Sequence, residues 1–115
     1  MAPLLDQEQI AELQAILEDD FADLVDTFLN DLTLQLEILH RALDATDGQT
    51  VYAKAHRLKS GSGSIGARRL SELFQQMEDC SRDNRLDSCN ALLQQVDQSA
   101  SQTRAILQAI VHPGH

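Results

Sequence analysis

The chain has 115 residues, a length typical of one domain, and 43% of them are hydrophobic, enough for one core without disulfides or structural metals. Its 18 acidic residues outnumber nine basic ones, and the net charge of −9 argues against binding to nucleic acid or to an anionic membrane surface. Aromatic and β-branched residues are few, and the two prolines, Pro3 and Pro113, lie near the ends. We therefore expect a single all-α domain over residues 1–115.

Apolar side chains recur at helical spacing along most of the chain and predict five helices. A short first helix precedes a long second one that begins at the acidic pair Asp19-Asp20. Asp47 is the expected N-cap of the third helix, the fourth runs from about Ala67 to near residues 81–84, and the last spans residues 89–110. The expected core stripes, in chain order, are Ile10, Leu13, Leu17; Phe21, Leu24, Val25, Phe28, Leu32, Leu36, Leu39, Leu43; Val51, Ala55, Leu58, Ser62, Ile65; Leu70, Leu73, Phe74, Met77; and Cys89, Leu93, Val96, Ala100, Thr103, Leu107, Ile110.

The spacing of these stripes also predicts how the helices pack. Apolar residues of the last helix alternate steps of four and three, which is typical of the seam of a helix bundle. Short connections between successive long helices make neighbours antiparallel. We predict an up-down-up-down four-helix bundle with an additional short N-terminal helix, and we expect a monomer because one bundle buries each seam.

Several kinds of segment and site are not expected. The first six residues lack the basic start and apolar core of a signal peptide, and no run of about 18 apolar residues occurs, so we expect a cytoplasmic protein. Cys80 and Cys89 are not in a CxxC pair, which favours two free thiols. The four histidines lack the i,i+4 spacing that grips one ion, and we predict no bound metal.

His56 is the candidate reactive side chain. The core stripe of the third helix centres roughly 140° away from it around the helix, so the imidazole is expected to face out of the bundle. Lys59, one turn along, lies roughly 60° from His56, within reach of an anion held on the ring. Gly63 lies about 20° from His56 two turns on, so small side chains border the imidazole on its C-terminal side.

The glycines after His56 call for an explanation. A glycine in a helix interior costs about 1 kcal/mol relative to alanine, so Gly61 and Gly63 favour close approach by a partner if the helix continues through them. The alternative is a helix that ends near Lys59 and becomes a Ser/Gly loop. Residues 61–66 also match the dinucleotide pattern G-x-G-x-x-G, but the preceding residues are charged and helical in period, and we reject that motif.

A neutral imidazole is a good nucleophile toward phosphorus, and the two negative charges of a phosphohistidine can be offset by a nearby cation such as Lys59. From the residues alone, a surface histidine without chemistry is the alternative. The motif Ala55-His56-x-Leu58-Lys59, followed by small residues and by Gly63, Gly66 and Ala67, resembles the signature of histidine-containing phosphotransfer (HPt) domains. The resemblance covers nearly the whole chain, since that family is similarly a four-helix bundle with an extra N-terminal helix.

This resemblance implies an intermediate of multistep phosphorelays. Such a protein takes a phosphoryl group from an aspartate on the receiver domain of a hybrid sensor kinase and passes it to an aspartate on a response regulator. It would bind no ATP and have no kinase activity of its own, which agrees with the absence of kinase motifs. The receiver would supply Mg²⁺, and we expect no cofactor on this chain.

The resemblance also implies roles for individual residues. His56 would accept the phosphoryl group through Nε2, with Lys59 as the cation beside it. Glu78 falls where family members often carry a Gln or Glu that hydrogen-bonds the histidine ring, and its alternative is an exposed helix carboxylate. Small residues at Ser60, Gly61 and Gly63 would clear space for receiver loops. Arg57 either contacts the partner or is solvated.

Three questions stay open at this point. The family usually has glycine where this chain has Ser60, which affects partner preference or transfer rate. The competing interpretation of function is a non-catalytic helical adaptor that binds receiver domains or another partner through its His56 face or its first helix, around Ile10 and Leu13. A third interpretation of function is a degenerate family member that binds receivers without carrying phosphate. The presence of both His56 and Lys59 argues against this interpretation. The initial Met and the final His-Pro-Gly-His favour a free-standing module over a domain excised from a larger sensor kinase.

Overall fold

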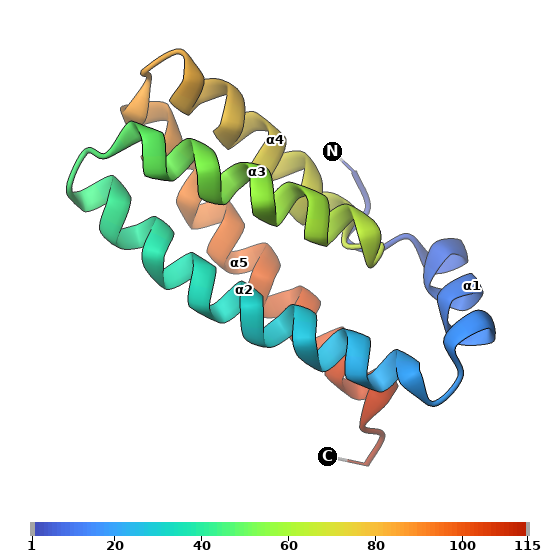
Figure 1. Cartoon of the computed structure of the whole chain (residues 1–115). Helices are drawn as coiled ribbons and strands as arrows, with labels where there is room; N and C mark the ends of the chain where they lie inside the picture. Colours follow the sequence, from blue (N-terminus) through green and yellow to red (C-terminus); the bar gives the residue numbers. More distant parts are fainter. Residues whose placement is uncertain (1, 115) are drawn as a thin grey trace.

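The computed structural model describes residues 2–114 and contains five α-helices in that range (Figure 1). Their bounds are α1 Gln7–Leu17, α2 Asp20–Asp44, α3 Gly48–Ser64, α4 Arg68–Arg82 and α5 Leu86–Val111. Helices α2 to α5 form the bundle: α2 and α4 each pack against both α3 and α5. Helix α1 lies at the end of the bundle where α2 begins and α3 ends (Figure 1). The predicted antiparallel four-helix bundle with an N-terminal helix is confirmed.

Short connections between the helices produce this topology, and side chains cap two of the helix starts. Asp47 accepts a hydrogen bond from the Thr50 backbone N–H at 3.2 Å, which confirms the predicted N-cap of α3. Asp6 caps α1 in the same way, through Gln9 N at 3.1 Å. At α2, Asp19 makes no side-chain cap, but acidic side chains lie in the first turn, where the helix dipole favours negative charge. Connections this short make each helix run antiparallel to the previous one.

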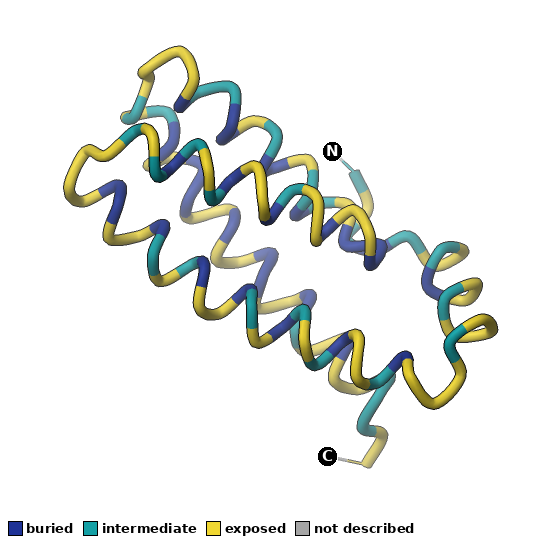
Figure 2. The backbone as a smooth tube through the Cα atoms, in the orientation of Figure 1, coloured by how far each residue is buried: buried dark blue, intermediate teal, exposed yellow. Residues whose placement is uncertain are grey.

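Most residues of the predicted core stripes are buried, and Leu13, Leu17, Phe28 and Leu36 are half-buried. Figure 2 shows the alternation of buried and exposed positions along each helix. The α5 seam is buried from Cys89 to Leu107, and Ile110 is half-buried. Leu24 is the exception, because it is 38% exposed. At 100° per residue, Leu24 lies about 100° around α2 from buried Val25, at the edge of the buried stripe. Both thiols are free, with Cys89 buried and Cys80 half-buried.

Helix α3 continues through both interior glycines to Ser64, so the alternative of a Ser/Gly loop after Lys59 is wrong. The anchors are Ser62 and Ile65, which stay in phase with the core and are almost fully buried. The turn comes at Gly66, whose φ of +84° suits glycine, and whose carbonyl accepts the Asp6 N–H at 2.8 Å. The G-x-G-x-x-G pattern therefore ends a helix, and residues 2–114 contain no strand, which confirms its rejection as a dinucleotide motif. Nowhere in that range is a helix both long and apolar enough to span a bilayer.

Candidate functional site

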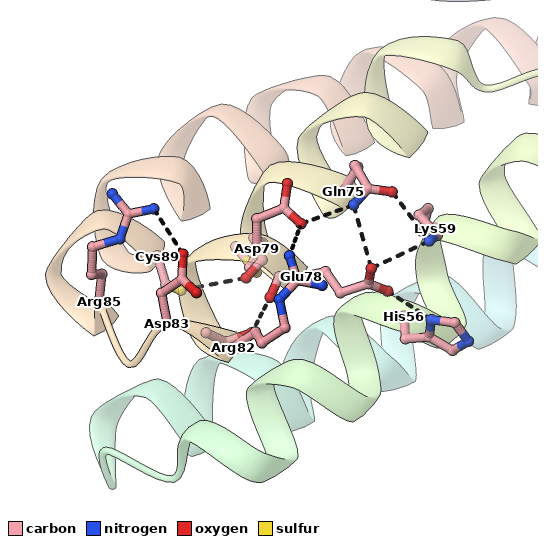
Figure 3. A network of polar contacts seen from close by, with 11 residues as sticks. His56, Lys59, Gln75, Glu78, Asp79, Arg82, Asp83, Arg85 and Cys89 are labelled. Carbon is pink, nitrogen blue, oxygen red and sulfur yellow. Dashed lines mark hydrogen bonds and ion pairs between the residues drawn. The ribbon is translucent and has the colours of Figure 1, made fainter.

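His56 faces out of the bundle from the middle of α3, as predicted, and its side chain is 60% exposed. Its Nδ1 lies 2.6 Å from Oε1 of Glu78 on α4 (Figure 3). A carboxylate can only accept, so Nδ1 carries the hydrogen of this bond. In the neutral ring, Nε2 then has a free lone pair, and no group among residues 2–114 hydrogen-bonds to it. The imidazole is thus oriented at one nitrogen and open at the other.

Glu78 is nearly buried, with 6% of its side chain exposed, so its alternative as an exposed helix carboxylate is wrong. Burial by itself raises the pKa of Glu78, but hydrogen bonds from His56 and Lys59 and the charge of Lys59 outweigh burial and hold that pKa below its usual value. The side chain is therefore a carboxylate at neutral pH. A buried carboxylate of this kind fixes the orientation of the ring.

The Lys59 ammonium lies beside the same carboxylate. Its Nζ is 3.3 Å from Oε2 of Glu78 and 3.1 Å from Oε1 of Gln75, and 26% of the side chain is exposed (Figure 3). The two oxygens of Glu78 thus bind one donor each from His56 and Lys59. The sequence predicted that Lys59 lies near His56. The structure adds that its ammonium hydrogen-bonds to two side chains of α4.

Gln75 has no place in the sequence prediction, although a signal for it exists. His56 and Glu78 each lie 11 positions from Ala67 in the α3–α4 turn, and Lys59 and Gln75 each lie eight positions from it. In an antiparallel pair of helices, residues equally far from the turn lie at the same level. Folding α3 onto α4 about the turn would have placed Gln75 opposite Lys59.

Arg57 is neither simply solvated nor unpaired. Its Nη2 lies 2.8 Å from Oδ1 of Asp31 on α2, and its Nε lies 3.3 Å from Oδ2, a two-pronged ion pair. Through these bonds, Arg57 holds the pKa of Asp31 below its usual range. The pair ties α3 to α2 next to the histidine, a role that the sequence did not indicate.

The small residues beside His56 lie on an open surface. Ser60, Gly61 and Gly63 are all exposed. A Cβ at Gly61 would meet ring carbons of Phe28 at 3.9 and 4.0 Å, and one at Gly63 would meet Oγ of Ser71 at 3.4 Å. Both are tolerable contacts, so internal packing does not require glycine at either position. Beside Gly63, a hollow of about 570 Å³ opens next to Lys59.

Tyr52, one turn before His56, is a further neighbour that the sequence analysis assigned no role. The two rings are parallel within 10°, with centroids 6.3 Å apart, an offset stack. Tyr52 covers the N-terminal side of the imidazole, whereas small residues lie on its C-terminal side.

Charge is distributed unevenly around this site. Seven of the nine lysines and arginines lie between Lys54 and Arg85, on α3, α4 and the turn that follows, against four acidic residues in that stretch. This stretch of the sequence is thus basic in an acidic protein. Residues 2–114 hold no cluster of three side chains suited to a metal ion.

The fold and site define a helix-bundle protein that presents one oriented histidine beside a lysine. The sequence model of the Hpt domain family matches residues 23–108, and the chain belongs to that family. It is 33% identical over 97 residues to histidine-containing phosphotransfer protein 2 of Arabidopsis thaliana, an alignment that covers 78% of this chain and 62% of that protein. It is 29% identical to protein 5 of the same plant, covering 86% of this chain and 58% of the relative. The chain spans about three fifths of the length of these curated relatives.

Solved structures agree with this assignment. The crystal structure of histidine-containing phosphotransfer protein B from Pseudomonas aeruginosa PAO1 superposes with a TM-score of 0.94 at 32% identity, and the match covers 100% of both chains. A histidine-containing phosphotransfer protein from maize superposes with a TM-score of 0.86 at 27% identity, covering 94% of this chain and 89% of that one.

Proposed function

We propose that this protein is a phosphorelay intermediate that carries a phosphoryl group on Nε2 of His56. The observation that supports this function best is the geometry of His56, with Nδ1 bound to buried Glu78 and Nε2 open to solvent. An exposed histidine without a function would have no need of a nearly buried carboxylate to orient it.

The chemistry follows from this arrangement. The Nε2 lone pair attacks phosphorus on the receiver's aspartyl phosphate, an N–P bond forms, and the P–O bond to the aspartate breaks, which leaves a free carboxylate. The ring keeps the Nδ1 hydrogen, and its positive charge is offset by Glu78. In the second transfer an aspartate of the response regulator attacks phosphorus, and the electron pair of the N–P bond returns to Nε2. Lys59 offsets charge on the phosphoryl group.

We also propose the partners and setting. The donor is the receiver domain of a hybrid sensor kinase, the acceptor is a response regulator, and each receiver brings the Mg²⁺ that the transfer requires. The basic stretch from Lys54 to Arg85 suits an acidic, metal-binding receiver site despite the net charge of −9. We further propose a cytoplasmic monomer, which light scattering after gel filtration would test for its oligomeric state.

The test uses a radiolabelled, phosphorylated receiver domain with Mg²⁺, mixed with wild type, His56→Gln or His40→Gln. His40 is the matched control, since it is also an exposed histidine beside a carboxylate, Asp97 at 3.0 Å. We expect acid-labile, base-stable label on wild type and His40→Gln and none on His56→Gln. Absence of label on all three with several receivers, together with receiver binding that survives His56→Gln, would favour the helical adaptor instead.

A further inference from the structure

The Gln75 side chain connects the two charged groups that flank His56. Its carbonyl oxygen Oε1 accepts a hydrogen bond from Lys59 Nζ at 3.1 Å. Its amide nitrogen Nε2 lies 3.4 Å from Oε2 of Glu78 and 3.0 Å from Oδ1 of Asp79 (Figure 3). One amide therefore contacts the lysine through its acceptor and the buried carboxylate through its donor.

In the unphosphorylated protein the Lys59 ammonium is hydrogen-bonded to side chains of α4. Among residues 2–114 its ammonium hydrogen-bonds to two side chains, Gln75 and Glu78, both on α4. Only 26% of the lysine side chain is exposed. A phosphoryl group on Nε2 of His56 adds about two negative charges on the outer side of the ring. It competes with Glu78 for the ammonium.

Moving the ammonium toward the phosphoryl group has a consequence for Glu78. Its Oε2 would lose the lysine, and a buried carboxylate oxygen without a donor is unfavourable. The amide nitrogen of Gln75 is already beside that oxygen and can stay as its donor. A glutamate at this position would offer no donor and would add a second carboxylate, and an apolar side chain would offer neither group.

We propose that Gln75 is a positioning residue for phosphotransfer that acts through Lys59. Its carbonyl oxygen holds the ammonium close to His56 before transfer, and its amide nitrogen keeps Glu78 hydrogen-bonded when the ammonium turns to the phosphoryl group. This role rests on the proposed function of His56 as the phosphoacceptor.

The experiment compares Gln75→Met and Gln75→Glu with wild type, using the rate of transfer from a phosphorylated receiver and the lifetime of the phosphohistidine. Gln76→Met is the matched control, because Gln76 is the exposed neighbour on the same helix. We expect Gln75→Met to slow transfer by about ten-fold, the effect of one lost hydrogen bond to a charged group, and to shorten the lifetime. Gln75→Glu should also slow transfer, because its carboxylate holds the ammonium back. Gln76→Met should match wild type.

A double-mutant cycle separates positioning from a purely structural role. If Gln75 acts through Lys59, then Gln75→Met slows transfer less in a Lys59→Met background than in wild type, and the slowing that remains is the loss of its hydrogen bond to Glu78. An equal slowing in both backgrounds, or transfer by both Gln75 variants at the wild-type rate, would overturn the inference while leaving the proposed function intact. A wild-type protein that takes no label would refute both. Circular dichroism of each variant checks that the helices are intact.

Discussion

The substitution Gly61→Ala tests whether glycine at this position is required for stability of the fold or for phosphotransfer to a partner. Gly61 lies inside α3, and the added Cβ would meet nothing closer than the Phe28 ring carbons at 3.9 and 4.0 Å. These are ordinary van der Waals distances, so the substitution gains the full helix propensity of alanine, about 1 kcal/mol. With an unfolding entropy of about 2.1 cal/mol/K per residue, that gain raises the Tm of a chain of this length by about 4 °C.

Urea unfolding followed by circular dichroism at constant m value measures this change. The control is Gly66→Ala, where φ is +84° and a Cβ would lie only 3.2 Å from Cγ1 of Ile10. That variant should lose about 1 kcal/mol or more, because the turn requires the left-handed conformation. The unfolding free energy is therefore expected to rise in Gly61→Ala and to fall in Gly66→Ala.

The transfer rate then tests why Gly61 is there. A glycine that lowers stability without an internal reason points to close approach by a partner, so Gly61→Ala should be more stable than wild type and slower in transfer. A loss of stability would refute the packing argument, since it would mean that α3 needs glycine at this position. Wild-type transfer by a stabilised variant would instead refute the idea that a partner requires the space.

Three further predictions follow from the same surface and core. Ser60→Gly should transfer at the wild-type rate and Ser60→Gln should block docking, and equal transfer by both would contradict the need for a small residue there. Glu78 has a lowered pKa in the folded state, so its contribution to stability is present above about pH 4.5 and is lost as the pH falls through the folded value. The gap in unfolding free energy between wild type and Glu78→Gln should therefore narrow from pH 6 to pH 3, and a constant gap would contradict this. Burial raises the pKa of the Cys89 thiol to about 11, so at pH 8 about one in a thousand is a thiolate, and maleimide should label Cys80 first, as mass spectrometry of peptides would show.

The local parts of this protein could be predicted from its sequence. Helix periodicity predicted the five helices and the outward direction of His56, because the direction of a helical residue depends on its angle from the buried stripe. Asp47 was recognisable as a cap because capping involves residues three positions apart. The prediction placed Leu24 in the core, whereas the side chain lies at the edge of the stripe and is 38% exposed.

The partners of the site residues were decided by tertiary structure. Glu78 looked equally suited to an exposed surface or to the histidine ring, and Arg57 showed no sign of its partner Asp31. Such contacts depend on which helices are neighbours and on their relative height, which the short α3–α4 turn sets for one pair and the closure of the bundle sets for the other. The contacts of Gln75 with Lys59 and Glu78 likewise depend on the packing of α3 against α4. The sequence by itself determined the helices and the reactive histidine, whereas the long-range register of the packed helices decided what holds that histidine and its lysine.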